Sequence, residues 1–277
     1  MMGASGRLPL VVGVGAVAVA LLCVGCDGSD DLPPPPPASG RVIDTERGTA
    51  TPYGTGAEQV WVLRPKSGEM RSVVVYLHGY GAYLPFEWHL QWMDHLLEKG
   101  STVIFPRYQP GGDDPFILTP FDLAAGLRTG FDAIEYDGEP VVAAGFSLGA
   151  TLAFVYAARA EEWGVPAPHA VYSIFPVDPI LVDVGLDLST IENTKALLLV
   201  GDHDDVVGQD GARELLNGLV GLPRSLKELR TIRTTDDLFA SHEAPTVVHD
   251  PVVRRTFWVP LDRLVAGARR EGDGGNA

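Results

Sequence analysis

Residues 141–154 read Val-Val-Ala-Ala-Gly-Phe-Ser-Leu-Gly-Ala-Thr-Leu-Ala-Phe. This stretch predicts a buried strand, a tight turn at Ser147 and then a helix. A serine on such a turn needs small neighbours, because larger side chains there would collide with the backbone, and Gly145 and Gly149 meet that need. The serine also lies at a helix amino terminus, where free N–H groups can stabilise a developing oxyanion. We therefore expect Ser147 to be a nucleophile; the alternative is a serine that only caps a helix.

Short β-branched runs alternate with longer helical patterns on both sides of this stretch. Such alternation is typical of β-α-β units and a mostly parallel sheet. The sequence therefore predicts a doubly wound α/β fold with helices on both faces of the sheet. Strands are expected at residues 59–63, 72–77, 102–105, 141–145, 170–174, 196–200 and 226–232. Helices are expected at residues 85–99, 120–136, 148–162, 210–219 and 251–269.

Upstream of the serine, another turn follows an apolar run. Val73-Val-Val-Tyr-Leu77 leads into His78-Gly-Tyr-Gly81. Together with the Gly-x-Ser-x-Gly turn, this resembles the α/β-hydrolase superfamily, in which an oxyanion loop follows the third strand. The resemblance implies that the backbone N–H groups of Tyr80 and Leu148 bind the oxyanion. Taken alone, His-Gly-x-Gly after a strand is also an ordinary turn.

An acidic loop follows the expected strand at 196–200. Residues 201–207 read Gly-Asp-His-Asp-Asp-Val-Val, which resembles the superfamily's Gly-x-x-Asp-x-Val-Val pattern with Asp204 as the acid of a catalytic triad. That acid lies buried beside the histidine, where it fixes the tautomer and stabilises the imidazolium. Asp202 and Asp205 are expected to cap the loop or face solvent. Asp178 remains an alternative acid, because some members of the superfamily take it from after the preceding strand.

The base of such a triad comes last in the chain, since the order in this fold is Ser, Asp, His. Only His242 and His249 follow Asp204. His242 lies between the last expected strand and the final helix, which resembles the superfamily's histidine loop. His249 is expected to cap that helix or to lie on the surface. The predicted triad is therefore Ser147, His242 and Asp204.

These residues predict acyl transfer through a covalent serine intermediate, with no cofactor and no metal. The layout is similar to that of dienelactone-hydrolase-like esterases, which implies an exported serine esterase acting on small ester substrates. An acyltransferase, a haloperoxidase or a non-catalytic binding protein on the same fold stays possible, because the fold does not determine the function.

The sequence says less about the cap and the substrate pocket around the site than about the triad. About 20 residues separate the strands ending at Ile174 and starting at Ala196, an ordinary loop length that predicts a small cap and no large lid. Aromatic residues cluster after the oxyanion loop and are expected either to line an acyl pocket or to fill the core. They are Tyr80, Tyr83, Phe86, Trp88 and Trp92.

The composition is that of a globular, acidic protein. The 277 residues are 45% apolar, and 21 basic against 36 acidic side chains give a formal charge of −15. This balance argues against nucleic acid as a partner, since phosphate contacts need clustered Lys and Arg. At roughly 150 residues per domain, the length allows one large domain or two small ones. No internal repeat or second linker is visible, so one catalytic domain over residues 41–277 fits best.

The first 25 residues have the pattern of an export signal. Arg7 precedes an apolar run from Leu8 to Gly25 that carries no charge, and the composition then switches to Asp27-Gly-Ser-Asp-Asp31. A cysteine after Val24-Gly25 resembles the lipobox of bacterial lipoproteins, which implies cleavage before Cys26 and acylation of its thiol. An uncleaved membrane anchor is the alternative, since about 18 apolar residues can just span a bilayer.

Residues 26–40 are expected to link this segment to the domain. Five consecutive prolines, Pro33 to Pro37, favour the stiff polyproline II conformation. The sequence thus predicts a domain held at a membrane of the bacterial cell envelope, on its periplasmic or extracellular face. Both cysteines, Cys23 and Cys26, precede the domain, so its nucleophile must be an oxygen.

Overall fold

The computed structural model describes residues 41–82, 84–86, 88–109 and 119–274. The expected signal segment, Cys26 and the proline-rich linker lie outside these residues, as does Tyr83.

Nine strands of the described residues form one sheet in the order β1-β2-β3-β5-β4-β6-β7-β8-β9. The strands from β5 to β9 run parallel, whereas β1, β2 and β3 form an antiparallel edge against β5. Their bounds are β1 Ile43–Asp44, β2 Gly48–Tyr53, β3 Val60–Pro65, β4 Ser72–Leu77, β5 Ser101–Pro106, β6 Val141–Phe146, β7 Ala170–Ile174, β8 Lys195–Gly201 and β9 Lys227–Ile232.

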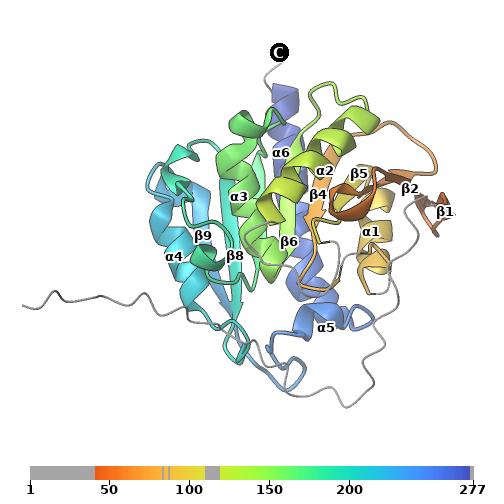
Figure 1. Ribbon diagram of the computed structural model, residues 1–277. Helices are drawn as coiled ribbons and strands as arrows, with labels where there is room; N and C mark the ends of the chain where they lie inside the picture. Colours follow the sequence, from red (N-terminus) through yellow and green to blue (C-terminus); the bar gives the residue numbers. More distant parts are fainter. Residues whose placement is uncertain (1–40, 83, 87, 110–118, 275–277) are drawn as a thin grey trace, which may run out of the picture. The chain divides into compact units, whose positions relative to one another are not determined.

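Helices cover both faces of the sheet. Side chains of α2, α3 and α4 pack on one face, and those of α1 and α6 pack on the other. Figure 1 shows α2 and α3 in front of the sheet and α6 behind it. The bounds are α1 His89–Glu98, α2 Thr119–Ala133, α3 Leu148–Trp163, α4 Asp210–Gly218, α5 Pro251–Val253 and α6 Val259–Gly274, with a π-helical segment at Arg254–Trp258. The predicted α/β fold with a mostly parallel sheet is confirmed.

The central strands are buried on both faces, as their unbroken apolar runs predict. Every residue of β4 and of β6 is buried. The parallel strands end at one edge of the sheet, at Leu77, Phe146 and Gly201. The segments that follow these ends, and the loop that follows the end of β9 at Ile232, therefore meet, and they carry the expected triad and oxyanion residues.

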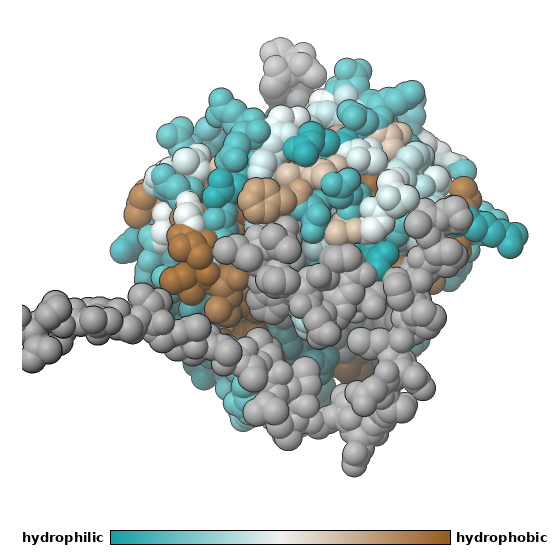
Figure 2. All heavy atoms as spheres, viewed as in Figure 1, coloured by the Kyte–Doolittle hydropathy of each residue, from teal (hydrophilic) through white to brown (hydrophobic). Residues whose placement is uncertain are grey.

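The segment between β7 and β8 forms no domain of its own. It contains two short 3-10 turns, Pro179–Leu181 and Leu188–Thr190. Exposed apolar side chains are found here, with Ile180 60% and Val184 73% accessible. Figure 2 shows apolar side chains gathered at the lower left of the viewed face. The segment fits the expected small cap.

Candidate active site

Ser147 occupies a strained turn between β6 and α3. Its backbone angles are φ 55° and ψ −119°, a conformation that residues with a side chain rarely adopt. A Cβ atom at Gly145 would lie 2.1 Å from the carbonyl oxygen of Gly149, and one at Gly149 would lie 2.1 Å from that of Leu77. Both positions therefore require glycine, which explains the Gly-x-Ser-x-Gly pattern. Strain of this kind is retained where the surrounding fold enforces it, most often at functional sites.

The structure brings Ser147, His242 and Asp204 into one hydrogen-bonded row. Oγ of Ser147 lies 3.0 Å from Nε2 of His242, and Nδ1 of His242 lies 2.9 Å from Oδ2 of Asp204. A carboxylate can only accept, so Nδ1 carries the proton and Nε2 of the neutral ring accepts from the serine hydroxyl. All three residues are buried, and the Asp204 side chain is fully inaccessible. The row has the connectivity that a general base needs to activate a hydroxyl.

The backbone holds the Asp204 carboxylate in one orientation. Its Oδ1 accepts the N–H groups of Val206 and Val207, at 3.0 and 3.1 Å. Oδ2 is thereby directed at His242. The two oxygens have separate partners, so the carboxylate cannot rotate without breaking hydrogen bonds.

Asp202 joins the acidic loop to the loop that carries His242. Its Oδ1 accepts the N–H and the hydroxyl of Thr234, both at 2.9 Å, and Oγ1 of Thr234 accepts the N–H of Ala240 at 3.0 Å. Hydrogen bonds from His203 and then from Thr234 lower the pKa of Asp202 to about 2. Asp202 is thus a loop-capping residue, one of the two roles expected for it, while Asp205 is exposed.

The alternative acid and base have other surroundings. Asp178 accepts the N–H of Ile180 and caps the 3-10 turn that follows it. His249 is exposed and contacts Gln91, and the carboxylate that caps α5 belongs to Asp250. His249 therefore has the surface position that was one of its two expected roles.

The expected oxyanion loop runs beside the nucleophile. A Cβ atom at Gly79 would lie 3.5 Å from Cβ of Ser147 and 3.1 Å from the Phe146 ring. Leu148 is the first residue of α3, and the first N–H groups of a helix have no acceptor within it. Tyr80 is 46% exposed, so this residue lies at the surface of the site.

The loop after β5, which sequence reasoning did not connect with the site, supports the oxyanion loop. The hydroxyl of Tyr108 donates to the carbonyl oxygen of His78, and the two rings stack with centroids 4.1 Å apart. Nδ1 of His78 lies 2.6 Å from the oxygen of Gly79, and Nε2 lies 2.7 Å from that of Arg107. Burial lowers the pKa of His78 to about 4, and the two carbonyl oxygens act in the opposite direction. No sequence motif signals this support, because its parts are about 30 residues apart and meet only through β4–β5 pairing.

Aromatic rings form one side of the site. The ring of Phe146 lies 4.9 Å from that of His242 and 5.8 Å, edge to face, from that of Trp88. Trp88 is half-buried, whereas Trp92 is completely buried in the core under α1. Of the expected pocket candidates, Trp88 thus reaches the site and Trp92 fills the core.

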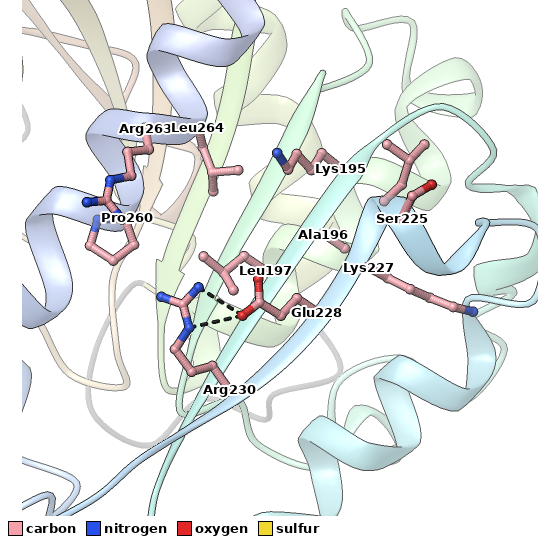
Figure 3. A pocket seen from close by; sticks show the side chains of 11 residues that line it. Lys195, Ala196, Leu197, Ser225, Lys227, Glu228, Arg230, Pro260, Arg263 and Leu264 are labelled. Carbon is pink, nitrogen blue, oxygen red and sulfur yellow. Dashed lines mark hydrogen bonds and ion pairs between the residues drawn. The ribbon is translucent and has the colours of Figure 1, made fainter.

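A pocket at the opposite edge of the sheet belongs to another surface. Figure 3 shows it between the starts of β8 and β9 and helix α6, with Arg230 paired to Glu228 at 2.8 Å. β8 begins at Lys195 in this pocket, whereas Asp204 follows its other end. The pocket and the row of Ser147, His242 and Asp204 therefore lie at opposite ends of one strand.

No family model matches the chain, and no curated protein matches it. Many solved structures do match it. An esterase of Pyrococcus furiosus superposes with a TM-score of 0.58 at 15% identity, over 80% of this chain and 92% of that one. Esterase B from Lactobacillus rhamnosis superposes with a TM-score of 0.60 at 15% identity, over 79% of this chain and 84% of that one. An esterase of Pyrobaculum calidifontis superposes with a TM-score of 0.58 at 17% identity, over 82% of this chain and 86% of that one.

The chain has the α/β-hydrolase fold. At these identities the likeness concerns the fold alone. Among the described residues, no helix is long and apolar enough to cross a membrane.

Proposed function

We propose that the protein is a serine hydrolase that cleaves carboxylic esters. The observation that carries the proposal is the buried row in which Ser147 contacts His242 at 3.0 Å and His242 contacts Asp204 at 2.9 Å. The adjacent oxyanion loop and the α/β-hydrolase fold support it.

In the acylation step, Oγ of Ser147 attacks the ester carbonyl carbon as Nε2 of His242 takes the hydroxyl proton. The tetrahedral intermediate collapses, the bond to the alcohol oxygen breaks, and the imidazolium of His242 protonates the leaving alcohol. A water molecule then attacks the acyl-enzyme, gives its proton to His242, and releases the acid and free Ser147. Asp204 keeps the proton on Nδ1 and stabilises the imidazolium in both steps.

Negative charge on the former carbonyl oxygen is stabilised by two backbone N–H groups, those of Tyr80 and Leu148. Two observations support this assignment: Gly79 passes beside Ser147, and Leu148 is the first residue of α3. Donors fixed in advance cost no reorganisation when the charge develops. These steps require no metal and no cofactor.

The expected substrates are small esters. The fold neighbours include esterases, one of which, that of Lactobacillus rhamnosis, carries a phosphonate inhibitor related to tributyrin. In the part of the chain that the structure describes, the segment between β7 and β8 is a small cap and no large lid lies over the serine, which favours soluble, short-chain esters over those that need a lid to open.

The test is turnover of p-nitrophenyl esters of two to twelve acyl carbons by residues 41–277, with Ser147→Ala as the inactive variant. We expect hydrolysis that is strongest at the short end and lost in Ser147→Ala. Full activity in Ser147→Ala would reject the proposal. Adding an alcohol acceptor separates hydrolysis from acyl transfer, since a transferase yields a new ester in preference to the free acid.

We also propose that the protein is exported and acylated at Cys26, with residues 26–40 as spacer. The support is the apolar run from Leu8 to Gly25 and the cysteine that follows it. Labelling with a radioactive fatty acid in a bacterial host is expected for the wild type and absent in Cys26→Ser. Cys23→Ser is the matched control and should keep the label. Unchanged labelling of Cys26→Ser would reject acylation at this residue.

A further inference from the structure

We infer that Gln109 is a positioning residue that orients the oxyanion loop; the inference rests on the proposed function. Gln109 is completely buried in the loop after β5, and its Oε1 accepts the backbone N–H of Gly81 at 3.0 Å. Gly81 directly follows Tyr80, whose N–H is one of the two proposed oxyanion donors. The side chain therefore contacts the loop one peptide unit away from that donor.

The N–H of Tyr80 lies in the peptide plane that joins Gly79 to Tyr80, and the next plane, which joins Tyr80 to Gly81, helps to fix the position of the Tyr80 Cα atom to which that N–H is attached. In the first plane, the carbonyl oxygen of Gly79 accepts the N–H of Ala82 at 3.2 Å and lies 2.6 Å from Nδ1 of His78. A trans peptide is planar, so its N–H points away from its C=O. Fixing the oxygen of Gly79 thus directs the N–H of Tyr80 to the opposite side.

The second plane joins Tyr80 to Gly81, and Gln109 holds it. Gly81 has φ +77°, a conformation open to glycine, and none of the residues that the structure describes lies within 4 Å of the place of its missing Cβ. The hydrogen bond from its N–H to Oε1 of Gln109 restrains this residue. Loss of this hydrogen bond would free one restraint on the plane between Tyr80 and Gly81, and a rotation of that plane would displace the Cα atom of Tyr80 and with it the donor.

The backbone that carries the Gln109 side chain is itself held by hydrogen bonds, as that of a positioning residue must be. Its N–H donates to the carbonyl oxygen of Arg107 at 2.6 Å, and Nε of Arg107 donates to the carbonyl oxygen of Gln109 at 3.0 Å. Tyr108, between them, donates to the oxygen of His78. The chain from Arg107 to Gln109 thus fastens the oxyanion loop at both of its ends. A misplacement of about 1 Å at a catalytic donor can cost about 100-fold in rate, so this restraint has a measurable effect.

The test uses Gln109→Met, which keeps the length of the side chain and removes the acceptor. Gln109→Asn, which draws the acceptor back by one methylene group, is the second variant if the first unfolds. Thr194→Val is the control, because it removes a buried side-chain bond to a backbone carbonyl, at 2.8 Å, next to the start of β8 and far from Ser147. Each is assayed for kcat and KM on p-nitrophenyl butyrate and for inhibition by a trifluoromethyl ketone, whose adduct with serine carries an oxyanion.

We expect kcat of the Gln109 variants to fall about tenfold to 100-fold, less than the loss typical of deleting an oxyanion donor outright. KM should change less than twofold, the inhibition constant should rise by the same factor as kcat/KM falls, and Thr194→Val should leave all three unchanged. A folded variant with kcat within twofold of wild type, or with lowered kcat and unchanged inhibition, overturns the inference. An inactive wild-type protein overturns the proposed function instead. Hydrogen exchange of the Gly81 amide, which should speed up in Gln109→Met, reports separately whether Gln109 holds the loop.

Discussion

Asp204→Asn replaces one oxygen of a carboxylate by an NH₂ group at nearly constant size. The structure decides which atom changes. Oδ1 of Asp204 accepts two backbone N–H groups, from Val206 and Val207, and an NH₂ group in that place would face both donors. The amide oxygen of the asparagine therefore takes the position of Oδ1. The NH₂ group takes the position of Oδ2, which in the wild type lies 2.9 Å from Nδ1 of His242.

An NH₂ group can only donate, so Nδ1 of His242 must then accept and the proton of the neutral ring moves to Nε2. That nitrogen can no longer take the proton of Ser147. Enforcing the wrong tautomer in a serine triad lowers kcat by about 10⁴, equivalent to about 5 kcal/mol of transition-state stabilisation. The packing around Asp204 is unchanged, so the variant should remain folded.

The assay compares kcat of wild type, Asp204→Asn and Asp205→Asn on p-nitrophenyl butyrate, with urea unfolding of each. Asp205 is the exposed neighbour, and its variant should keep wild-type activity. A folded Asp204→Asn protein that retains more than a tenth of wild-type kcat would refute the tautomer argument.

Three further perturbations follow from the same structure. Gly149→Ala should lower the free energy of unfolding by about 2 kcal/mol or more, because its Cβ would lie 2.1 Å from the carbonyl oxygen of Leu77; urea unfolding equal to wild type would contradict this packing. His89→Phe should make the protein less sensitive to acid. Burial holds the pKa of His89 well below 6.5, so below pH 6.5 the unfolded chain binds a proton that the folded protein does not. The free energy of unfolding of the wild type therefore falls by about 1.4 kcal/mol for each pH unit below 6.5 through this residue alone. His89→Phe should lack this contribution, and an equal pH dependence of the free energy of unfolding in both proteins between pH 4.5 and 7 would contradict the prediction. Thr234→Val removes the hydroxyl that joins the acidic loop to the loop of His242 and should lower kcat more than it raises KM, whereas unchanged kinetics would show that the loops hold their places without it.

The parallel strands could be predicted closely from the sequence, and the edge of the sheet could not. β4 and β7 have the bounds expected from the sequence, because burial on both faces makes most of their positions apolar and sets them apart from the loops around them. β2, at Gly48–Tyr53, was missed. It contains glycine and proline and forms only because β3 pairs with it along its whole length, a contact that local sequence does not encode.

The ends of helices were also predicted less closely than their apolar faces. The helix expected from Pro85 begins at His89, and the final helix is interrupted by a π-helical segment at Arg254–Trp258. Periodicity locates the apolar face of a helix, but backbone hydrogen bonds and packing decide where the helix begins and whether one turn widens.

Ser147, Asp204 and His242 could be chosen from the sequence because each follows a recognisable strand. Tyr108 and Gln109 could not, since an aromatic residue and an amide in a loop carry no chemical signature of their own. Their contacts with His78 and Gly81 arise from the pairing of β4 with β5.

The central claim is that Ser147 is the nucleophile of an ester hydrolase, and covalent trapping tests it most directly. A p-nitrophenyl butylphosphonate should react with Oγ of Ser147, forming an O–P bond and releasing one p-nitrophenol per chain. Mass spectrometry of the digested protein is expected to find the phosphonyl group on the peptide that contains Ser147, with no adduct in Ser147→Ala and a far slower reaction in His242→Ala. Stoichiometric labelling of another residue, or a folded wild-type protein that hydrolyses esters and takes up no label at Ser147, would contradict the account.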